Sequence, residues 1–199
     1  MIVSNEFKFI FIRVPKTGSS SITKCLRNFK ILNNGIFEYR HDDYDFINDE
    51  ELQFFNNLRL DNPDLILSPN HSECAGCEKI LEPDVCKNYF KFSFVRNPWS
   101  RLVSRYTWEC KLVNDMTDST IFKSFKNYLK HIDEDNFHAF VQPQYDYTIG
   151  CNFIGKCENL QQDFDIVCDK IGIPKQKLTH ENKTKHKHYS EYYDDETRQ

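Results

Sequence analysis

The stretch FKFIFIRVPKTGSSS at residues 7–21 decides how this chain of 199 residues begins to fold. Its apolar run at 9–12 is too short for a membrane span and suits a strand that is covered on both faces. Pro15 and Gly18 break the strand pattern. Beyond them, apolar residues recur at the spacing of a helix, at Ile22, Cys25, Leu26 and Phe29. A strand, a tight turn and a helix in this order aim backbone N–H groups and a helix N-terminus at an anion. The stretch therefore predicts an α/β unit with an anion-binding turn.

The residues of this turn supply charge and hydroxyl groups. Lys16 adds a point charge, and the three serines at 19–21 add hydroxyl donors. The alternative interpretation is a serine cap of the helix beside a surface lysine. The turn is not the common P-loop, because Lys16 precedes the only glycine and the Gly-Lys-Ser/Thr ending is missing. An ATP or GTP site of that type is therefore not expected.

A second strand-to-helix junction follows at residues 90–106. Phenylalanines alternate with other residues over 90–95, which predicts a strand, and the Asn-Pro pair at 97–98 is typical of a helix start. Arg96 then lies at the strand end and Ser104 about two turns into the helix. Both are expected to reach a single phosphate group beside the sheet. The alternative is an arginine-rich helix face that is only solvated.

The two junctions together resemble the sulfotransferase family, in its branch that modifies carbohydrates and related hydroxyl compounds. The resemblance implies that the first turn binds the 5′-phosphosulfate of 3′-phosphoadenosine 5′-phosphosulfate (PAPS), the sulfuryl donor. The residues implied are Pro15, Lys16, Thr17, Gly18, Ser19, Ser20 and Ser21. It also implies that Arg96 and Ser104 hold the 3′-phosphate of the donor. No metal is implied.

Two later segments support the resemblance. The sequence FIGKCENL at 153–160 is similar to a family segment, although Lys156 and Cys157 stand where the family has an arginine and an aromatic residue. The segment around Lys183 and Lys185 resembles a C-terminal family segment near the nucleotide, which implies both lysines as donor contacts. The similarity runs from about residue 7 to the end of the chain.

The fold expected is a P-loop-like three-layer α/β fold, with a central parallel β-sheet flanked by helices. Such sheets bind ligands at the carboxyl ends of their strands, where both junctions lie. Further helices are predicted at 50–58, 119–132 and 158–171, and a short strand at 65–68. We expect one domain over residues 1–199. Sequences of the family usually continue further at the C-terminus. We therefore expect the last C-terminal helix of this domain to be missing or shortened.

The amino-acid composition limits the classes of partner that are expected for this chain. The net charge of −4 argues against a general nucleic-acid binder, so positive charge at the nucleotide must be local, as Lys16, Arg96 and Arg101 would provide. The sequence shows no signal peptide pattern and no stretch near the length of a membrane span. We therefore expect a cytoplasmic protein, the alternative being an excised lumenal domain of a Golgi enzyme.

Eight cysteines are present, and Cys74 and Cys77 form one Cys-x-x-Cys pair. A structural zinc site usually has a second pair at a suitable spacing. None is evident, although Cys86 and His71 complete a loose candidate with the first pair. Reduced thiols and no metal are the expectation.

Sulfuryl transfer requires stabilised charge on the leaving oxygen and a base for the acceptor hydroxyl. Lys16 is expected to act on the bridging oxygen. His71 is the first candidate for the base, because it follows the predicted strand at 65–68 and a histidine often precedes the Arg-Asn-Pro strand in the family. A solvated turn histidine is the alternative, and His41 is the second candidate. Glu73 and Asp43 come next.

Acceptor contacts are expected from two segments. One is the charged aromatic cluster at 38–44, with Arg40 and His41. The other, at 137–145, resembles a family segment that lines the acceptor site and implies His138, Gln142 and Tyr145. The function expected is a PAPS-dependent sulfotransferase that acts on a carbohydrate or similar hydroxyl compound. A kinase-like enzyme that uses ATP and a non-catalytic nucleotide-binding homologue are the alternatives.

Overall fold

The computed structural model describes residues 1–26, 73–113, 120–134, 142–179 and 186–198. In these residues one sheet has four strands in the order β1 (Ile2–Ser4), β2 (Phe9–Ile12), β3 (Phe90–Val95) and β4 (Phe153–Lys156). β2, β3 and β4 are parallel, and β1 runs antiparallel to β2. The carboxyl ends of the three parallel strands therefore meet at one edge of the sheet.

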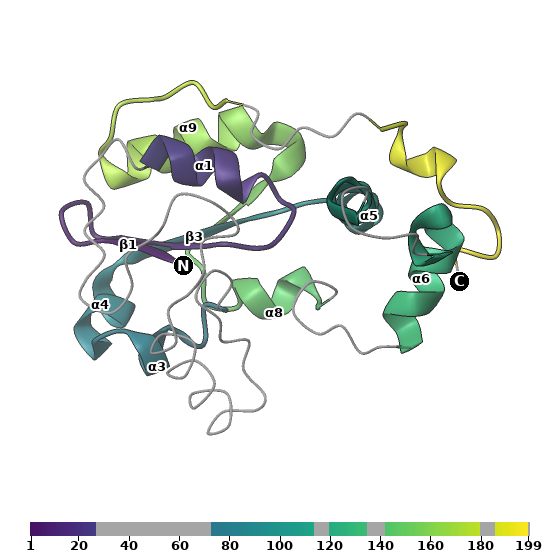
Figure 1. Cartoon of the computed structure of the whole chain (residues 1–199). Helices are drawn as coiled ribbons and strands as arrows, with labels where there is room; N and C mark the ends of the chain where they lie inside the picture. The colour runs from purple at the N-terminus through teal and green to yellow at the C-terminus, as the bar shows by residue number, and fades with distance from the viewer. Residues whose placement is uncertain (27–72, 114–119, 135–141, 180–185, 199) are drawn as a thin grey trace.

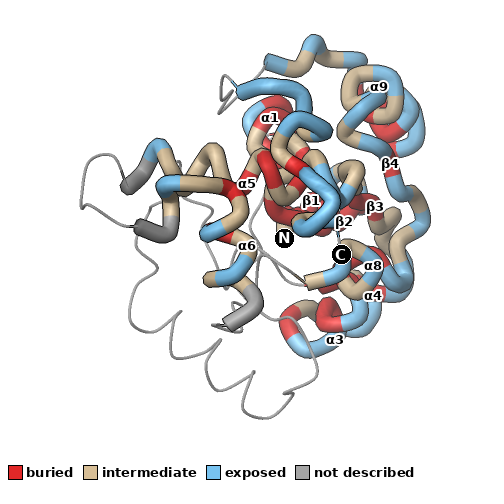
Figure 2. Tube along the Cα trace, turned by 90° about the vertical axis from the view of Figure 1, so that its right-hand side faces the viewer, coloured by how far each residue is buried: buried red, intermediate tan, exposed pale blue. Residues whose placement is uncertain are grey.

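Helices cover both faces of this sheet (Figure 1). One face carries α1 (Ser19–Leu26) and α9 (Leu160–Ile171); the other carries α3 (Cys77–Ile80), α4 (Pro83–Asn88) and α8 (Gln144–Thr148). Successive side chains along each strand point to opposite faces of the sheet. The phenylalanines of β2 and β3 pack toward α1 and α9, and the two isoleucines of β2 pack toward α3 and α8. Buried positions accordingly gather on the strands and on the helix sides that face them (Figure 2).

The aromatic strand pattern has a direct consequence for the core. Phe11 and Phe92 lie on paired strands with their rings stacked at a centroid distance of 4.9 Å, and Phe94 meets Phe11 edge-on at 6.5 Å. Aromatic pairs prefer such offset and edge-to-face arrangements. Since all three side chains are fully buried, they fix the position of β3 and hence of the residues that follow it.

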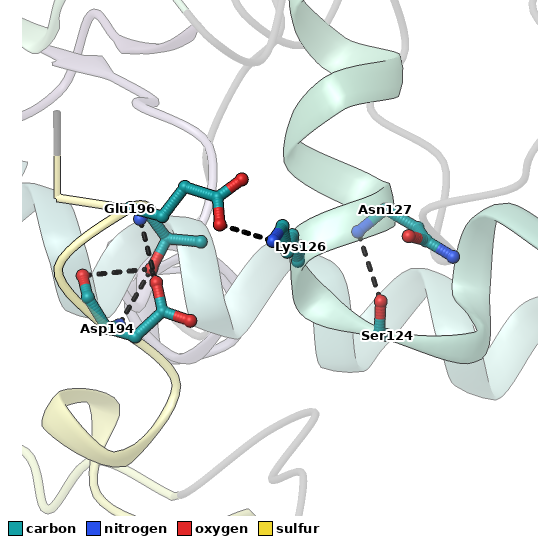
Figure 3. A network of polar contacts seen from close by, with 6 residues as sticks. Ser124, Lys126, Asn127, Asp194 and Glu196 are labelled. Atoms are coloured by element: carbon teal, nitrogen blue, oxygen red, sulfur yellow. Dashed lines mark hydrogen bonds and ion pairs between the residues drawn. The ribbon is translucent and has the colours of Figure 1, made fainter.

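A third cluster lies beyond the carboxyl end of β3. It joins α5 (Pro98–Val113), η2 (Thr120–Lys123), α6 (Phe125–Glu134) and η4 (Tyr189–Glu191). Tyr193 packs edge-on against Trp99 and Phe125, at centroid distances of 4.8 and 4.9 Å. Figure 3 shows polar contacts at its margin, where Lys126 of α6 pairs with Glu196. The C-terminal segment is thereby fastened to α5 and α6.

These observations confirm the α/β prediction with a mainly parallel, three-layer arrangement. The strands at 9–12 and 90–95 and the helices that follow them are present as expected. The helix expected over 119–132 is divided at Ser124, because η2 ends at Lys123 and α6 begins at Phe125. The predicted elements at 50–58 and 65–68 lie outside the described residues. None of the helices that the structure describes is long and apolar enough to cross a membrane.

Candidate active site

The turn after β2 has an unusual backbone. Lys16 has a φ of 65° and Gly18 a φ of 83°, both in the left-handed region. The carbonyl of Gly18 accepts hydrogen bonds from the N–H groups of Ser21 and Ile22 at 3.1 and 3.4 Å, so α1 starts directly after the turn. The left-handed conformation costs a non-glycine residue roughly 1–2 kcal/mol. The structure around Lys16 therefore holds it in a strained position, as functional turns often do.

Gly18 is also closely approached by two residues that lie far along the chain, Cys157 and Leu160. A Cβ atom on Gly18 would lie 2.8 Å from Cδ2 of Leu160 and 3.7 Å from Sγ of Cys157. The segment at 153–160 is thus packed against the turn. The sequence prediction grouped these two segments only by resemblance, and the structure brings them into contact.

The seven predicted residues of the turn differ in exposure. Pro15, Thr17, Ser19 and Ser21 are buried, and Lys16, Gly18 and Ser20 are half-buried. The Thr17 hydroxyl donates to the Val14 carbonyl at 2.9 Å, so this side chain closes the turn. The first N–H groups of any helix have no partner inside that helix. In α1 the N–H groups of Ser21 and Ile22 donate to Gly18, so the N–H groups of Ser19 and Ser20 and the side chains of Lys16 and Ser20 are the groups that an anion can meet here.

Lys16 also contacts α5. Its Nζ lies 4.5 Å from the ring centroid of Trp108. A cation at this distance from an indole ring is attracted to the face of the ring. The contact holds the ammonium group of the turn against α5.

Arg96 lies at the carboxyl end of β3 and turns toward the same place. Its Nη1 donates to the Lys16 carbonyl at 3.4 Å and its Nε to the Ser100 hydroxyl at 3.0 Å. Its backbone is held by the Gln144 side chain, whose Oε1 accepts from the Arg96 N–H at 2.8 Å and whose Nε2 donates to the Arg96 carbonyl at 2.7 Å. This paired contact fixes the strand end. No sequence signal predicted Gln144.

Arg101 binds three segments together. Its Nε donates to the Pro15 carbonyl at 3.0 Å and its Nη1 to the Gln142 carbonyl at 3.0 Å, while its own backbone belongs to α5. Burial lowers the pKa of the Arg101 guanidinium to about 10, which leaves it charged near neutral pH. The sequence assigned Arg101 only a general positive charge, and the structure shows a bracing contact.

Ser104 is half-buried on α5, about two turns into the helix as predicted. The neighbouring Arg105 is buried and forms an ion pair with Glu109 one turn further, with Nε 2.6 Å from Oε1. Since Arg101 and Arg105 are both buried, the alternative of a merely solvated arginine face is wrong for these two residues.

The helix start next to Arg96 is capped as the sequence predicted. Asn97 accepts through Oδ1 from the Ser100 N–H at 3.1 Å. The N–H of Asn97 donates to Oε1 of Glu158 at 2.7 Å. Burial raises the pKa of the Cys157 thiol while Arg96 acts in the opposite direction, which places Arg96 close to Cys157. The segment at 153–160 therefore touches both predicted halves of the site.

Several predicted residues lie outside the described part of the chain. They are Arg40, His41, His71, His138, Lys183 and Lys185. Of the two remaining acceptor candidates, Gln142 contributes its carbonyl to Arg101, and Tyr145 is 72% exposed. The histidines that are described, His131, His186 and His188, belong to α6 and the segment leading into η4.

Glu73 is a buried carboxylate on the same side of the molecule. Burial is the largest cause that raises the pKa of Tyr147, to about 12. Arg101 lowers this pKa, and Glu73 raises it. Glu73 and Arg101 thus both act on Tyr147, and Glu73 lies two residues after the predicted base. Among the described residues, no group of three or more His, Cys, Asp or Glu side chains is arranged to hold a metal ion.

Comparison with known proteins gives three findings. The model of one protein family, described as the sulfotransferase family, matches residues 1–199. An uncharacterized protein of Archaeoglobus fulgidus is 35% identical over 91 residues, which cover 44% of this chain and 72% of that protein. Carbohydrate sulfotransferase 14 of Danio rerio is 22% identical over 209 residues, which cover 87% of this chain and 48% of that protein. The chain therefore spans about half the length of the latter.

Proposed function

Because the chain belongs to the sulfotransferase family, we propose that it transfers a sulfuryl group from PAPS to a hydroxyl group of a carbohydrate or similar acceptor. The observation that carries the proposal is the contact between the two halves of the predicted site. Arg96 Nη1 lies 3.4 Å from the Lys16 carbonyl, and Arg101 Nε lies 3.0 Å from the Pro15 carbonyl. Two elements that we propose to bind anions meet there, which suits a nucleotide with phosphate groups on both the 3′ and the 5′ position of its ribose.

The residues present fit such a donor. The turn at 15–18 and the first N–H groups of α1 offer donors to the 5′-phosphosulfate, and Lys16 adds a positive charge. Arg96 offers a planar guanidinium and Ser104 a hydroxyl to the 3′-phosphate. Lys183 and Lys185 are proposed as further contacts by resemblance. The contacts of Arg96 to Ser100 and Lys16 hold its guanidinium at the edge of the turn before a ligand arrives.

The chemistry is a displacement at sulfur. The acceptor oxygen forms a bond to sulfur while the bond from sulfur to the bridging phosphate oxygen breaks, and the hydroxyl proton goes to a base. Lys16 stabilises the charge that develops on the bridging oxygen, an interaction that strengthens as the reaction proceeds. Positioning by Arg96 and the turn supplies much of the remaining catalysis, as in phosphoryl transfer.

We propose His71 as the base, followed by His41 and then Glu73. With saturating donor, His71→Ala should lose on the order of a hundred- to ten-thousandfold in kcat and keep its affinity for the nucleotide product. If His41→Ala or Glu73→Gln loses most of its turnover while His71→Ala keeps a normal kcat, the base is the residue whose substitution abolishes turnover. Arg40, His138, Gln142 and Tyr145 are proposed acceptor contacts.

Two measurements test the proposal. Calorimetry should show that 3′-phosphoadenosine 5′-phosphate binds roughly ten- to a hundredfold more tightly than adenosine 5′-phosphate, because a charge-assisted contact contributes about 1.5–3 kcal/mol. Labelled PAPS should then be turned over with a panel of hydroxyl acceptors. Equal binding of the two nucleotides, or preference for ATP, would overturn the proposed donor. Tight nucleotide binding without turnover of any acceptor would favour a non-catalytic homologue.

We further propose that residues 1–199 form a single domain of a cytoplasmic protein, with an excised lumenal domain of a Golgi enzyme as the alternative. The shared sheet supports the domain proposal, since α1, α8 and α9 pack on strands that all belong to it.

A further inference from the structure

Four cysteines gather on the face of the sheet that is opposite α1 and α9. Cys74, Cys77 and Cys86 are buried, and the half-buried Cys151 packs against the same cluster. The first three lie in or beside α3 and α4, whereas Cys151 follows α8. The proposed sulfuryl transfer uses none of these thiols.

The backbone holds Cys74 and Cys151 next to one another. The N–H of Cys74 donates to the Tyr147 carbonyl at 3.0 Å, and the N–H of Cys151 donates to the Thr148 carbonyl at 3.0 Å, so both are tied to α8. A Cβ atom on Gly150 would lie 3.5 Å from Sγ of Cys74. The turn that carries Cys151 is therefore in direct contact with the Cys74 sulfur.

The thiols share hydrogen bonds as well as space. Hydrogen bonds from Cys151 and then Cys77, together with the charge of Lys91, lower the pKa of Cys74 to about 4 although burial opposes this. The pKa values of Cys77 and Cys151 are raised by their contact with Cys74 and by burial. Of the three thiols, Cys74 is therefore the one whose thiolate form is favoured by its neighbours. A thiolate is the reactive form of cysteine.

Cys151 is better placed than Cys77 to react with Cys74. Cys77 is only 1% exposed, and its sulfur lies 3.4 Å from Sδ of Met1, which gives its S–H a second acceptor. Cys151 is half-buried and packs against the same cluster as Cys74.

A second pair of cysteines provides a natural comparison. Cys25 and Cys168 are buried in the cluster beneath α1 and α9 and are close enough to interact electrostatically. Burial and the neighbouring thiol raise the pKa of Cys25 to about 11, and burial raises the pKa of Cys168. Proximity is thus common to both pairs, whereas only the first pair contains a thiol whose pKa is lowered.

We propose that Cys74 and Cys151 form a peroxide-reactive thiol pair that closes to a disulfide. The Cys74 thiolate attacks one oxygen of hydrogen peroxide and the O–O bond breaks, which with one proton gives a sulfenic acid and water. The Cys151 sulfur then attacks the Cys74 sulfur, the S–O bond breaks, and hydroxide leaves as water with the Cys151 proton. Two thiols are oxidised by two electrons in total, and one peroxide is reduced to two waters.

The disulfide would link the segment just before α3 to the turn after α8. The same helix begins with Gln144, which holds the backbone of Arg96 on both sides. The thiol pair is therefore connected through one short helix to the strand end of the candidate active site, although the proposal does not depend on the activity of that site.

The test uses the full chain, reduced and freed of reductant. Brief treatment with hydrogen peroxide, alkylation of the remaining thiols, tryptic digestion and mass spectrometry should give a cross-link between the Cys74 and Cys151 peptides that dithiothreitol reverses. Cys77→Ser should keep the cross-link and Cys74→Ser should lose it, while Cys25 and Cys168 stay available for alkylation after unfolding. The initial rate should change little between pH 6 and pH 8, whereas an ordinary thiol gains about tenfold per pH unit.

Three results would overturn the proposal. The first is a disulfide inside the Cys74–Cys77 peptide in place of the cross-link. The second is oxidation of Cys25 and Cys168 at the same rate, which would mean that proximity alone decides. The third is an absence of any cross-link in the unsubstituted chain, and this result does not depend on whether a variant folds.

Discussion

At the scale of single residues, the turn between β2 and α1 places two demands on Gly18. Its φ of 83° disfavours any side chain, and Leu160 occupies the space that a Cβ atom would need, at 2.8 Å. Gly172, the cap of α9, has a similar φ of 75° but nothing within 4 Å of such an atom. A substitution of Gly172 therefore tests backbone strain alone, whereas one of Gly18 tests backbone strain and side-chain crowding together.

Gly18→Ala should lower the free energy of unfolding by about 1–3 kcal/mol more than Gly172→Ala does. Both variants place alanine in the left-handed region, which costs roughly 1–2 kcal/mol, and only the first forces Leu160 to move. Urea denaturation of the two variants and the unsubstituted chain measures the difference. Equal losses would mean that Leu160 shifts without cost and that the contact does not fix the turn.

Lys16 carries the prediction about catalysis at this scale. Lys16→Ala should lower kcat on the order of a hundredfold or more and change nucleotide affinity much less, because charge on the leaving oxygen develops only during transfer. Turnover at saturating donor and calorimetry with 3′-phosphoadenosine 5′-phosphate separate the two effects. Lys87→Ala, on an exposed position of α4, is the matched control. A normal kcat for Lys16→Ala would make Lys16 a residue of the turn without a catalytic role.

At the scale of elements, Arg101 connects α5 to the turn and to residue 142. The planar guanidinium of Arg101 donates to the carbonyls of both Pro15 and Gln142. Arg101→Lys keeps the charge, but the lysine ammonium group cannot make both contacts at once. We expect a loss of about 1–3 kcal/mol in stability and weaker nucleotide binding, since the turn loses its hydrogen bond from α5. Denaturation and calorimetry measure both, with Lys111→Ala in the last turn of α5 as control. Unchanged nucleotide affinity would show that α5 and the turn are positioned without Arg101.

The elements also show how far the sequence alone could lead. Alternating phenylalanines identified β3, the Asn97 cap identified the start of α5, and the Pro15 and Gly18 breaks identified the turn. β4 was missed as a strand, because only four residues follow the strand pattern and Gly155 interrupts them. A Cβ atom on Gly155 would lie 2.4 Å from the Phe94 ring, so this glycine is required by packing that a single sequence does not display.

The candidate site was predictable to a similar degree. Strand-to-helix turns have local signals, so Lys16 and Arg96 could be placed at strand ends from the sequence pattern, whereas the binding roles of Lys16, Arg96 and Ser104 came from the family resemblance and stay predictions. Gln144, Glu158 and Leu160 could not be placed in this way, because each acts on a residue at least 48 positions away through a backbone or packing contact. The Cys74–Cys151 pair was missed for the same reason: the sequence offered Cys77 as the partner of Cys74, and the fold adds Cys151 beside them.

At the scale of the whole molecule, the C-terminal segment is joined to the candidate site through α5. The Tyr193 hydroxyl donates to the Trp99 carbonyl at 3.0 Å, in the first turn of that helix and three residues after Arg96. The ring packs on Phe125 of α6, and Lys126 pairs with Glu196 nearby. The chain end thus closes the third cluster and steadies the helix that carries Ser104.

Tyr193→Ala should lower the free energy of unfolding by about 2–4 kcal/mol, because a buried ring is removed from between α5 and α6. Tyr193→Phe should cost only about 0.5–1.5 kcal/mol, the contribution of the hydrogen bond to Trp99. Tyr145→Ala, whose ring is 72% exposed, should stay within about 0.5 kcal/mol of the unsubstituted chain. Urea denaturation ranks the three variants, and calorimetry should show weaker binding of 3′-phosphoadenosine 5′-phosphate in Tyr193→Ala, since the start of α5 is loosened. If Tyr193→Ala is as stable as Tyr145→Ala and binds the nucleotide normally, the C-terminal segment contributes nothing to the placement of α5.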